Sequence, residues 1–249
     1  MSETHVPADT QAKQSARSVL HDALLGSLPE DKQQWFIQQL SQVTLDCDNR
    51  CVDIAMGLSP RRLGHGPMQF SVAHKQQLAS DIPGWKVDKL TVDAVARMLV
   101  LTCFDDPEQL TKQLVRLLRH ADLNEQLALY KALPLYPASE GINNCLADGL
   151  RSNISSVFEA IAHNNPYPAW HLDTHRFNHL VLKALFIGSS LTPIVGLQQR
   201  NNAELARILM DTARERLAAS RSVSPELWDT AMPFMSTAEK AEFNLETAS

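Results

Sequence analysis

Apolar side chains recur along this chain at intervals of three and four residues, the spacing that lines one face of an α-helix. The spacing is clearest in residues 92–103, 110–118, 123–130 and 206–217. In the first of these segments the apolar stripe consists of Val92, Val95, Ala96, Leu99 and Cys103. No segment alternates convincingly with a period of two residues, so the sequence predicts helices and no sheet.

Residues that favour helix N-termini stand just before many of these stretches: Asp88, Asp106, Asp122, Ser139, Asp173, Ser224 and Ser236. Stripes and caps together predict helices at 10–25, 30–44, 46–57, 71–80, 89–103, 107–120, 123–132, 140–151, 153–163, 174–187, 202–219, 225–231 and 237–243. Short connections favour antiparallel neighbours, and no helix can bury its stripe alone. We therefore predict an all-α fold, an irregular HEAT-like α-solenoid of stacked antiparallel helical pairs, with a compact helical bundle as the alternative.

The chain is predicted to form a single all-α domain over residues 11–249, preceded by a disordered polar tail over residues 1–10. Its 249 residues, 44% of them hydrophobic, are enough to bury a large core. The N-terminus lacks the apolar region of a secretory signal, and no apolar run approaches the roughly 20 residues that cross a bilayer. A cytoplasmic protein without membrane insertion is therefore expected.

The charge and the cysteines narrow the function classes further. A net charge of −5, with no basic runs, argues against nucleic acid as a partner. The four cysteines match no zinc-binding spacing, so free thiols are expected, and neither a metal nor a cofactor is predicted. Serine-hydrolase, zinc-protease and nucleotide-binding motifs are also missing from the sequence.

The segment at residues 59–67 combines two arginines, a histidine, two glycines and two prolines. Its composition predicts a surface connector, or alternatively a loop that contacts an anion above a groove. It lacks the pattern of a phosphate-binding loop.

A polar turn at residues 163–168 contains His163, Asn165 and Tyr167 between prolines and asparagines. Asn and Pro suit tight turns, so a structural turn is one interpretation. The other is a fixed polar corner that presents these three side chains to a ligand.

The helix that follows is apolar on nearly all sides between residues 177 and 187. Asn178 stands on an apolar face, so its amide either clamps a neighbouring turn or faces a cavity. His175, His179 and Lys183 form a narrow stripe that is either a solvated face or an anion-binding surface. A metal site is disfavoured because the lysine charge repels divalent cations, while a partly buried Lys183 could also act as a base.

Basic residues continue after this helix. Arg200 precedes a helix on which Arg207, Asp211 and Arg214 share one flank. The flank is either an ion-paired surface or, together with Arg200, a guanidinium site for a carboxylate or phosphate.

Several segments, taken in order, resemble the EboA family: ALYKALPLYP, GLRSNISSVFEAIAHNNPYP, FNHLVLKALFIG and the tract from residue 194 to 228. The resemblance is strong over residues 88–232 and looser before them. The residues that match typical family positions include Asn165, Tyr167, Asn178, Lys183, Arg200, Asn202, Arg207, Asp211 and the run at 225–228. The resemblance implies a role beside other proteins of a bacterial gene cluster for secondary metabolites. No reaction is established for the EboA family.

Two functional hypotheses follow. The first is a non-catalytic accessory, scaffold or metabolite-binding protein of such a pathway, with other ebo-type cluster proteins or a small metabolite as partners. A variant of it is a subunit that binds a partner helix along an apolar groove. The second is a cofactor-free enzyme acting on a small anionic or polar metabolite, which requires Tyr167, Asn178, Lys183 and Arg200 to meet in one pocket.

Overall fold

The structure is a computed structural model that describes residues 8–46 and 48–245. Within these residues the fold is all-α, and the prediction of helices without a sheet is confirmed. The only β-type pairings among them are two isolated bridges, Pro67 with Thr91 and His163 with Ile194.

The first half contains α1 (Thr10–Gly26), α2 (Glu30–Asp46), α3 (Asn49–Leu63), α4 (Val72–Asp81), α5 (Val92–Val100), η1 (Leu101–Cys103), α6 (Pro107–Leu118) and α7 (Leu123–Lys131). The second half contains η2 (Leu133–Leu135), α8 (Glu140–Leu150), α9 (Ser155–Ala162), α10 (Tyr167–His171), α11 (Thr174–Phe186), α12 (Leu197–Arg200), α13 (Ala203–Ala218), α14 (Pro225–Ala231), η3 (Met232–Phe234) and α15 (Thr237–Glu242).

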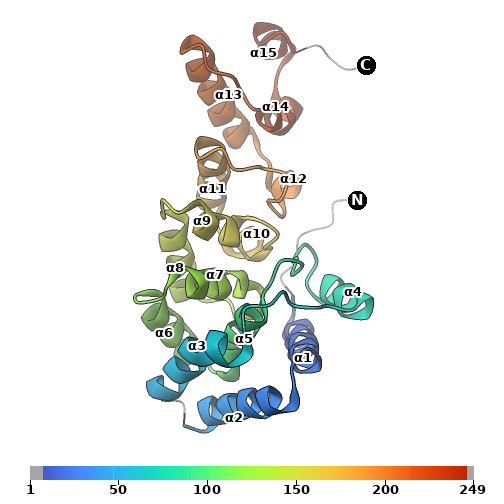
Figure 1. Cartoon of the computed structure of the whole chain (residues 1–249). Helices are drawn as coiled ribbons and strands as arrows, with labels where there is room; N and C mark the ends of the chain where they lie inside the picture. Colours follow the sequence, from blue (N-terminus) through green and yellow to red (C-terminus); the bar gives the residue numbers. More distant parts are fainter. Residues whose placement is uncertain (1–7, 47, 246–249) are drawn as a thin grey trace.

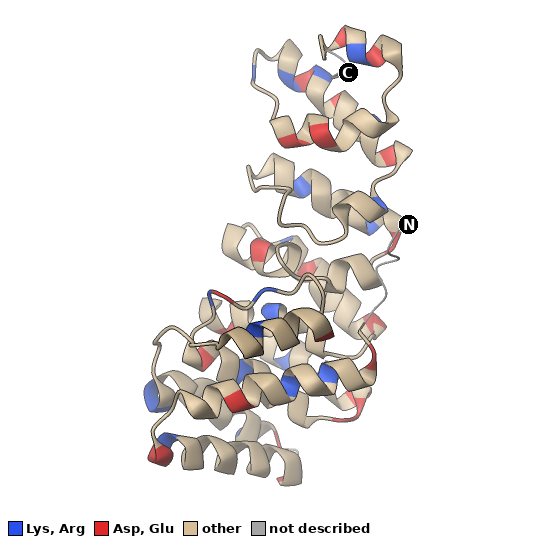
Figure 2. Cartoon of the chain, turned by 90° about the vertical axis from the view of Figure 1, so that its right-hand side faces the viewer, with Lys and Arg blue, Asp and Glu red and all other residues tan. Residues whose placement is uncertain are grey.

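The helices form an elongated stack (Figure 1), which is consistent with the predicted solenoid-like arrangement. Successive layers touch through α2 and α3, α3 and α5, α5 and α7, α7 and α9, and α8 and α9. The helices α13 to α15 form the end of the stack opposite α2 and α3. Acidic and basic residues are interspersed along the stack (Figure 2), so the view shows no face of a single charge.

The helix α5 lies at the centre of the lower half and is buried on every side. It packs against α1, α2, α3 and α7, which explains why its sequence is almost entirely apolar. The exceptions are Asp93 and Arg97, which form a buried ion pair at 3.2 Å one helical turn apart.

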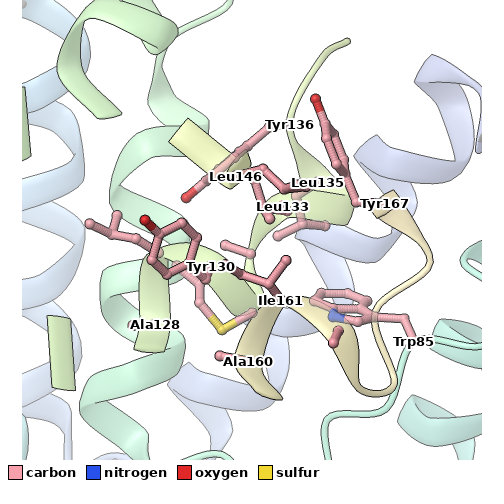
Figure 3. Packing of buried hydrophobic residues seen from close by; sticks show 14 of the residues in the cluster. Trp85, Ala128, Tyr130, Leu133, Leu135, Tyr136, Leu146, Ala160, Ile161 and Tyr167 are labelled. Atoms are coloured by element: carbon pink, nitrogen blue, oxygen red, sulfur yellow. The ribbon is translucent and has the colours of Figure 1, made fainter. Parts of the chain in front are cut away.

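A second part of the core joins α7, η2, α8, α9 and α10 through three buried tyrosines, Tyr130, Tyr136 and Tyr167 (Figure 3). The Tyr130 hydroxyl donates to the carbonyl oxygen of Cys145 at 3.3 Å. A Cβ atom on Gly149 would lie 2.6 Å from the Tyr130 ring, so only glycine lets α8 approach this closely.

The N-terminal helix is attached to this core by two long basic side chains. Lys13 donates to the carbonyl oxygen of Tyr136 at 2.6 Å, and Arg17 donates to that of Leu135 at 2.9 Å. Burial, followed by the neighbouring Arg17, lowers the pKa of Lys13 to about 8.

The prediction that residues 59–67 form a connector or anion-contacting loop is wrong for residues 59–63. The helix α3 continues through Pro60 to Leu63 and ends at Gly64, whose φ of 101° suits glycine. Proline has no N–H to donate to the carbonyl of Met56 four residues earlier. Arg97 Nε donates to that carbonyl instead, at 3.1 Å, so the helix tolerates its proline.

Other differences from the predicted elements are small. Two short helices, α10 and α12, lie in segments outside the predicted helices, and the start of α10 overlaps the predicted turn at 163–168. The N-cap of α5 is Thr91 rather than Asp88, which instead pairs with Lys75 at 2.9 Å. The caps predicted at Asp106, Asp122, Ser139, Asp173 and Ser236 are confirmed by hydrogen bonds to first-turn N–H groups.

Some predictions fall on undescribed positions. Most of the expected polar tail, residues 1–7, and Cys47 lie outside the described residues. Among the described cysteines, Cys51 and Cys145 are free thiols. In the part of the chain that the structure describes, no helix combines the length and apolar character needed to span a membrane.

The C-terminal helices are fastened to the rest of the stack through Glu226 in the first turn of α14. Its carboxylate accepts from the hydroxyls of Ser190 and Thr192, both at 2.6 Å, and from the N–H groups of Leu191 and Thr192 at 2.9 and 3.0 Å. Burial alone would raise the pKa of Glu226, but these hydrogen bonds lower it to about 2.

Candidate functional site

A cavity of about 320 Å³ lies between α7, α9 and the loop that precedes α5. Its lining is rich in polar and basic side chains: Trp85, Lys86, Asp88, Lys89, Leu90, Leu127, Lys131, Ser156, Glu159, Ala160, His163, Asn164 and Asn165. We call this the lysine groove, after Lys86, Lys89 and Lys131. Its volume is at the lower end of the range for small-molecule sites, which begins at about 300 Å³.

The loop is held in place by its apolar residues. Trp85, Val87 and Leu90 are buried, and the Trp85 indole N–H donates to the carbonyl oxygen of Lys131 at 3.0 Å. The intervening Lys86 and Lys89 are exposed as a result. Both contribute to the lining of the groove.

The groove has cations without carboxylate partners. None of its three lysines forms an ion pair with another described residue, whereas Asp88 is paired with Lys75 and Glu159 accepts from Ser189 at 2.8 Å. Burial, followed by the charge of Lys89, lowers the pKa of the half-buried Lys131. Two ammonium groups that repel each other in a cavity create a favourable place for an anion.

The turn at 163–165 closes one side of the groove. Asn164 has a φ of 51°, which few residues other than glycine adopt, and the carbonyl of Pro193 accepts from its N–H at 2.8 Å. His163 Nε2 lies 2.9 Å from the carbonyl oxygen of Ser190.

Asn165 lines the groove, but its side-chain amide forms its hydrogen bonds with other groups of the protein. It is 2% exposed, and its Nδ2 donates to the carbonyls of Tyr130 and Ala160 at 3.0 and 3.1 Å. Its Oδ1 accepts from the N–H of Tyr167 at 3.1 Å. Tyr167 is buried beneath the turn, its hydroxyl 3.5 Å from the carbonyl oxygen of Pro137, and burial raises its pKa.

Asn178 is buried and faces another asparagine, Asn202, in a reciprocal amide pair. Its Oδ1 accepts from Asn202 Nδ2 at 3.0 Å, and its Nδ2 donates to Asn202 Oδ1 at 3.3 Å. Asn202 is also the N-cap of α13, accepting from the N–H of Leu205. The pair therefore joins α11 to the start of α13.

Lys183 and Arg200 both donate to carbonyls at the C-terminal ends of neighbouring helices. Lys183 Nζ reaches the carbonyls of Leu150 and Ser152, the latter at 2.8 Å, and burial lowers its pKa. Arg200 donates to three carbonyls at the end of α10, the shortest contact being 2.7 Å to Leu172. Such cations also compensate the negative ends of helix dipoles.

The remaining predicted site residues lie on the surface of α13. Arg207 pairs with Glu204 at 2.8 Å and with Asp211 at 3.0 Å, and all three side chains are about half exposed. Arg214 continues this network by joining Asp211 to Glu242 of α15.

The structure thus brings His163 and Asn165 to the lysine groove, while the other predicted residues lie elsewhere. The polar groups of Tyr167, Asn178, Lys183 and Arg200 share no partner with one another and lie at different joints of the stack. Lys183 also borders a separate cavity of about 690 Å³ with His175 and His179, whose rings lie 4.3 Å apart.

A comparison with protein-family models matches residues 16–232 to a family described as metabolite traffic protein EboA. The chain belongs to the EboA family. The match includes the lysine groove and the joints formed by Asn178, Lys183 and Arg200. No curated protein and no solved structure matches the chain. The description of the EboA family suggests a role in metabolite traffic.

Sequence reasoning missed most of the groove of this EboA-family protein. The sequence pattern that could have indicated the groove is at 85–90, where apolar Trp85, Val87 and Leu90 are interrupted by Lys86 and Lys89. This pattern is too short to be recognised as a site. The described residues contain no cluster of three or more His, Cys, Asp or Glu side chains that could hold a metal ion.

Proposed function

We propose that this EboA-family protein is a non-catalytic binding protein of a metabolite traffic pathway, and that it holds a small anionic metabolite in the lysine groove. The observation that carries the proposal is the convergence of Lys86, Lys89 and Lys131 on one cavity while the nearby carboxylates are already paired. An anion would relieve the repulsion between Lys89 and Lys131 and would be only partly screened by solvent.

Calorimetric titration with ethyl phosphate and with propionate tests the proposal, because these probes present the two common anionic groups of small metabolites. Binding is expected to weaken at least tenfold in the double variant Lys86→Ser, Lys89→Ser and to weaken with added salt. The matched control is Lys112→Ser, an exposed lysine on α6 away from the groove. Equal affinity in all three proteins, or no binding of either probe, contradicts the proposal.

We further propose that the protein works in the cytoplasm beside other proteins of an ebo-type cluster as an accessory or scaffold. The elongated stack supports this role because an extended shape exposes more surface to partners than a compact one with the same number of residues (Figure 1). A pull-down with the tagged full chain against the other cluster proteins tests it. If the variant Lys86→Ser, Lys89→Ser still captures a cluster protein, docking does not depend on anion binding. If no cluster protein is captured, the scaffold role is contradicted.

A further inference from the structure

A second, smaller cavity of about 180 Å³ adjoins the lysine groove. The two cavities share Lys89, Leu90, Leu127 and Lys131 as lining residues. The smaller cavity leads from them to the buried ion pair of α5, because Asp93 belongs to its lining.

Asp93 is an unusual lining residue because it is only 2% exposed. Its Oδ2 lies 3.2 Å from an Arg97 nitrogen and 3.3 Å from His65 Nδ1. Its Oδ1 is buried and has no hydrogen-bond partner among the described residues. Burying a carboxylate oxygen without a donor is costly, and the cavity that Asp93 lines is the space next to this residue that a donor group could enter.

Within the ion-paired cluster around Asp93, the carboxylates outnumber the guanidinium. A second nitrogen of Arg97, Nη2, lies 3.4 Å from Glu125 Oε1, and its Nε donates to the carbonyl oxygen of Met56. One guanidinium therefore serves two carboxylates, which leaves the cluster with one excess negative charge when His65 is neutral. Lys89 and Lys131 line the same cavity, but neither forms an ion pair with Asp93.

We infer that the two adjoining cavities together take a small zwitterion, whose anionic group lies among the lysines and whose ammonium group donates to Asp93. This inference rests on the proposed function and specifies the class of ligand. The ammonium group would supply the donor that Oδ1 lacks and would neutralise the excess charge of the α5 cluster.

Two matched probe pairs test the inference by calorimetric titration of the full chain. Phosphoethanolamine differs from ethyl phosphate by an ammonium group, and β-alanine differs from propionate in the same way. Each zwitterion is expected to bind at least tenfold more tightly than its partner lacking the ammonium. In Asp93→Asn the preference is expected to fall toward one, while the control Lys112→Ser keeps it.

The outcomes separate this inference from the proposed function. Equal affinity within each pair in the wild-type protein overturns the zwitterion and leaves the anion site standing. A preference that survives in a folded Asp93→Asn protein overturns the assignment to Asp93. No binding of any probe overturns both proposals. Because the wild-type comparison needs no variant, it decides the inference even if circular dichroism shows that Asp93→Asn is unfolded.

Discussion

Lysine, arginine and asparagine side chains satisfy backbone carbonyls at the ends of short helices throughout this protein. Lys183 serves the end of α8 and Arg200 serves the end of α10. Asn165 does the same for α7 and α9. In a chain built from many short helices, the terminal carbonyls are numerous and need such donors. The polar residues thus stabilise the joints between helices.

Glu226→Gln tests the joint between α14 and the segment at residues 190–192, where one carboxylate accepts four hydrogen bonds. At pH 7 the substitution is expected to lower the free energy of unfolding by about 1–2 kcal/mol, because the group is partly exposed and loses charge-assisted hydrogen bonds. Its folded pKa of about 2 lies below the ordinary 4.5. The stabilisation is therefore complete above pH 4.5 and is lost as the pH falls toward 2.

Urea unfolding of the wild-type and variant proteins at pH 6 and pH 3 measures this difference, which should shrink by about half or more at pH 3. Glu215→Gln is the control, since Glu215 is exposed on α13, and should change stability by less than about 0.5 kcal/mol. A difference that is equal at both pH values would argue against the depressed pKa.

The sequence identifies Asn178, Lys183 and Arg200 as unusual but does not reveal their partners. An amide or ammonium makes the same hydrogen bonds with a protein carbonyl as with a ligand, so composition cannot separate the two roles. Only His163 and Asn165 of the predicted residues reach the groove. The lysines come together from a loop and a helix about 45 residues apart in the chain, a proximity that tertiary packing alone creates.

At the scale of whole elements, α3 shows how one helix depends on another. Its Met56 carbonyl cannot bond to Pro60 and depends on Arg97 from α5. The proline and the arginine are therefore coupled even though they lie in different helices.

A double-mutant cycle with Pro60→Ala and Arg97→Lys measures this coupling. Alanine at position 60 restores an N–H that can donate to Met56, so it should stabilise the lysine variant by about 1 kcal/mol more than it stabilises the wild type. Urea unfolding of the four proteins gives the value. Pro225→Ala, at the start of α14, should combine additively with Arg97→Lys. Additivity of the Pro60 change would contradict the coupling.

Most helix positions follow from the apolar stripes because these stripes record which face is buried. The short helices α10 and α12 escape this approach, since five or four residues make little more than one turn and show no period. The continuation of α3 through Pro60 also escapes it, because the compensating donor comes from residue 97 and is invisible to local reasoning.

At the scale of the whole molecule, the centre of the lower half and the α13–α15 end of the stack differ in how they are supported. The central helix α5 packs against α1, α2, α3 and α7. The helices α13 and α14 pack on each other and join the rest through the Asn178–Asn202 pair and through Glu226. In a stacked fold, each layer is stabilised mainly by its neighbours.

Native-state hydrogen exchange should therefore show a lower opening free energy for α13 to α15 than for α5. Asn178→Ala is expected to lower the value for α13 to α15 by a further 1–3 kcal/mol, roughly the cost of an unpaired buried amide, and to leave α5 unchanged. Asn153→Ala, at an exposed turn, is the control. An equal decrease throughout the chain would indicate a single cooperative unit instead.

The contact between Lys13 and the carbonyl of Tyr136 spans 123 residues of sequence. During synthesis at about 5–20 residues per second, the first helix waits about 6–25 seconds before its partner leaves the ribosome. In that interval, α1 can already pack against the earlier helices α4 and α5. The docking of α1 is therefore completed only when η2 and Tyr136 have emerged from the ribosome.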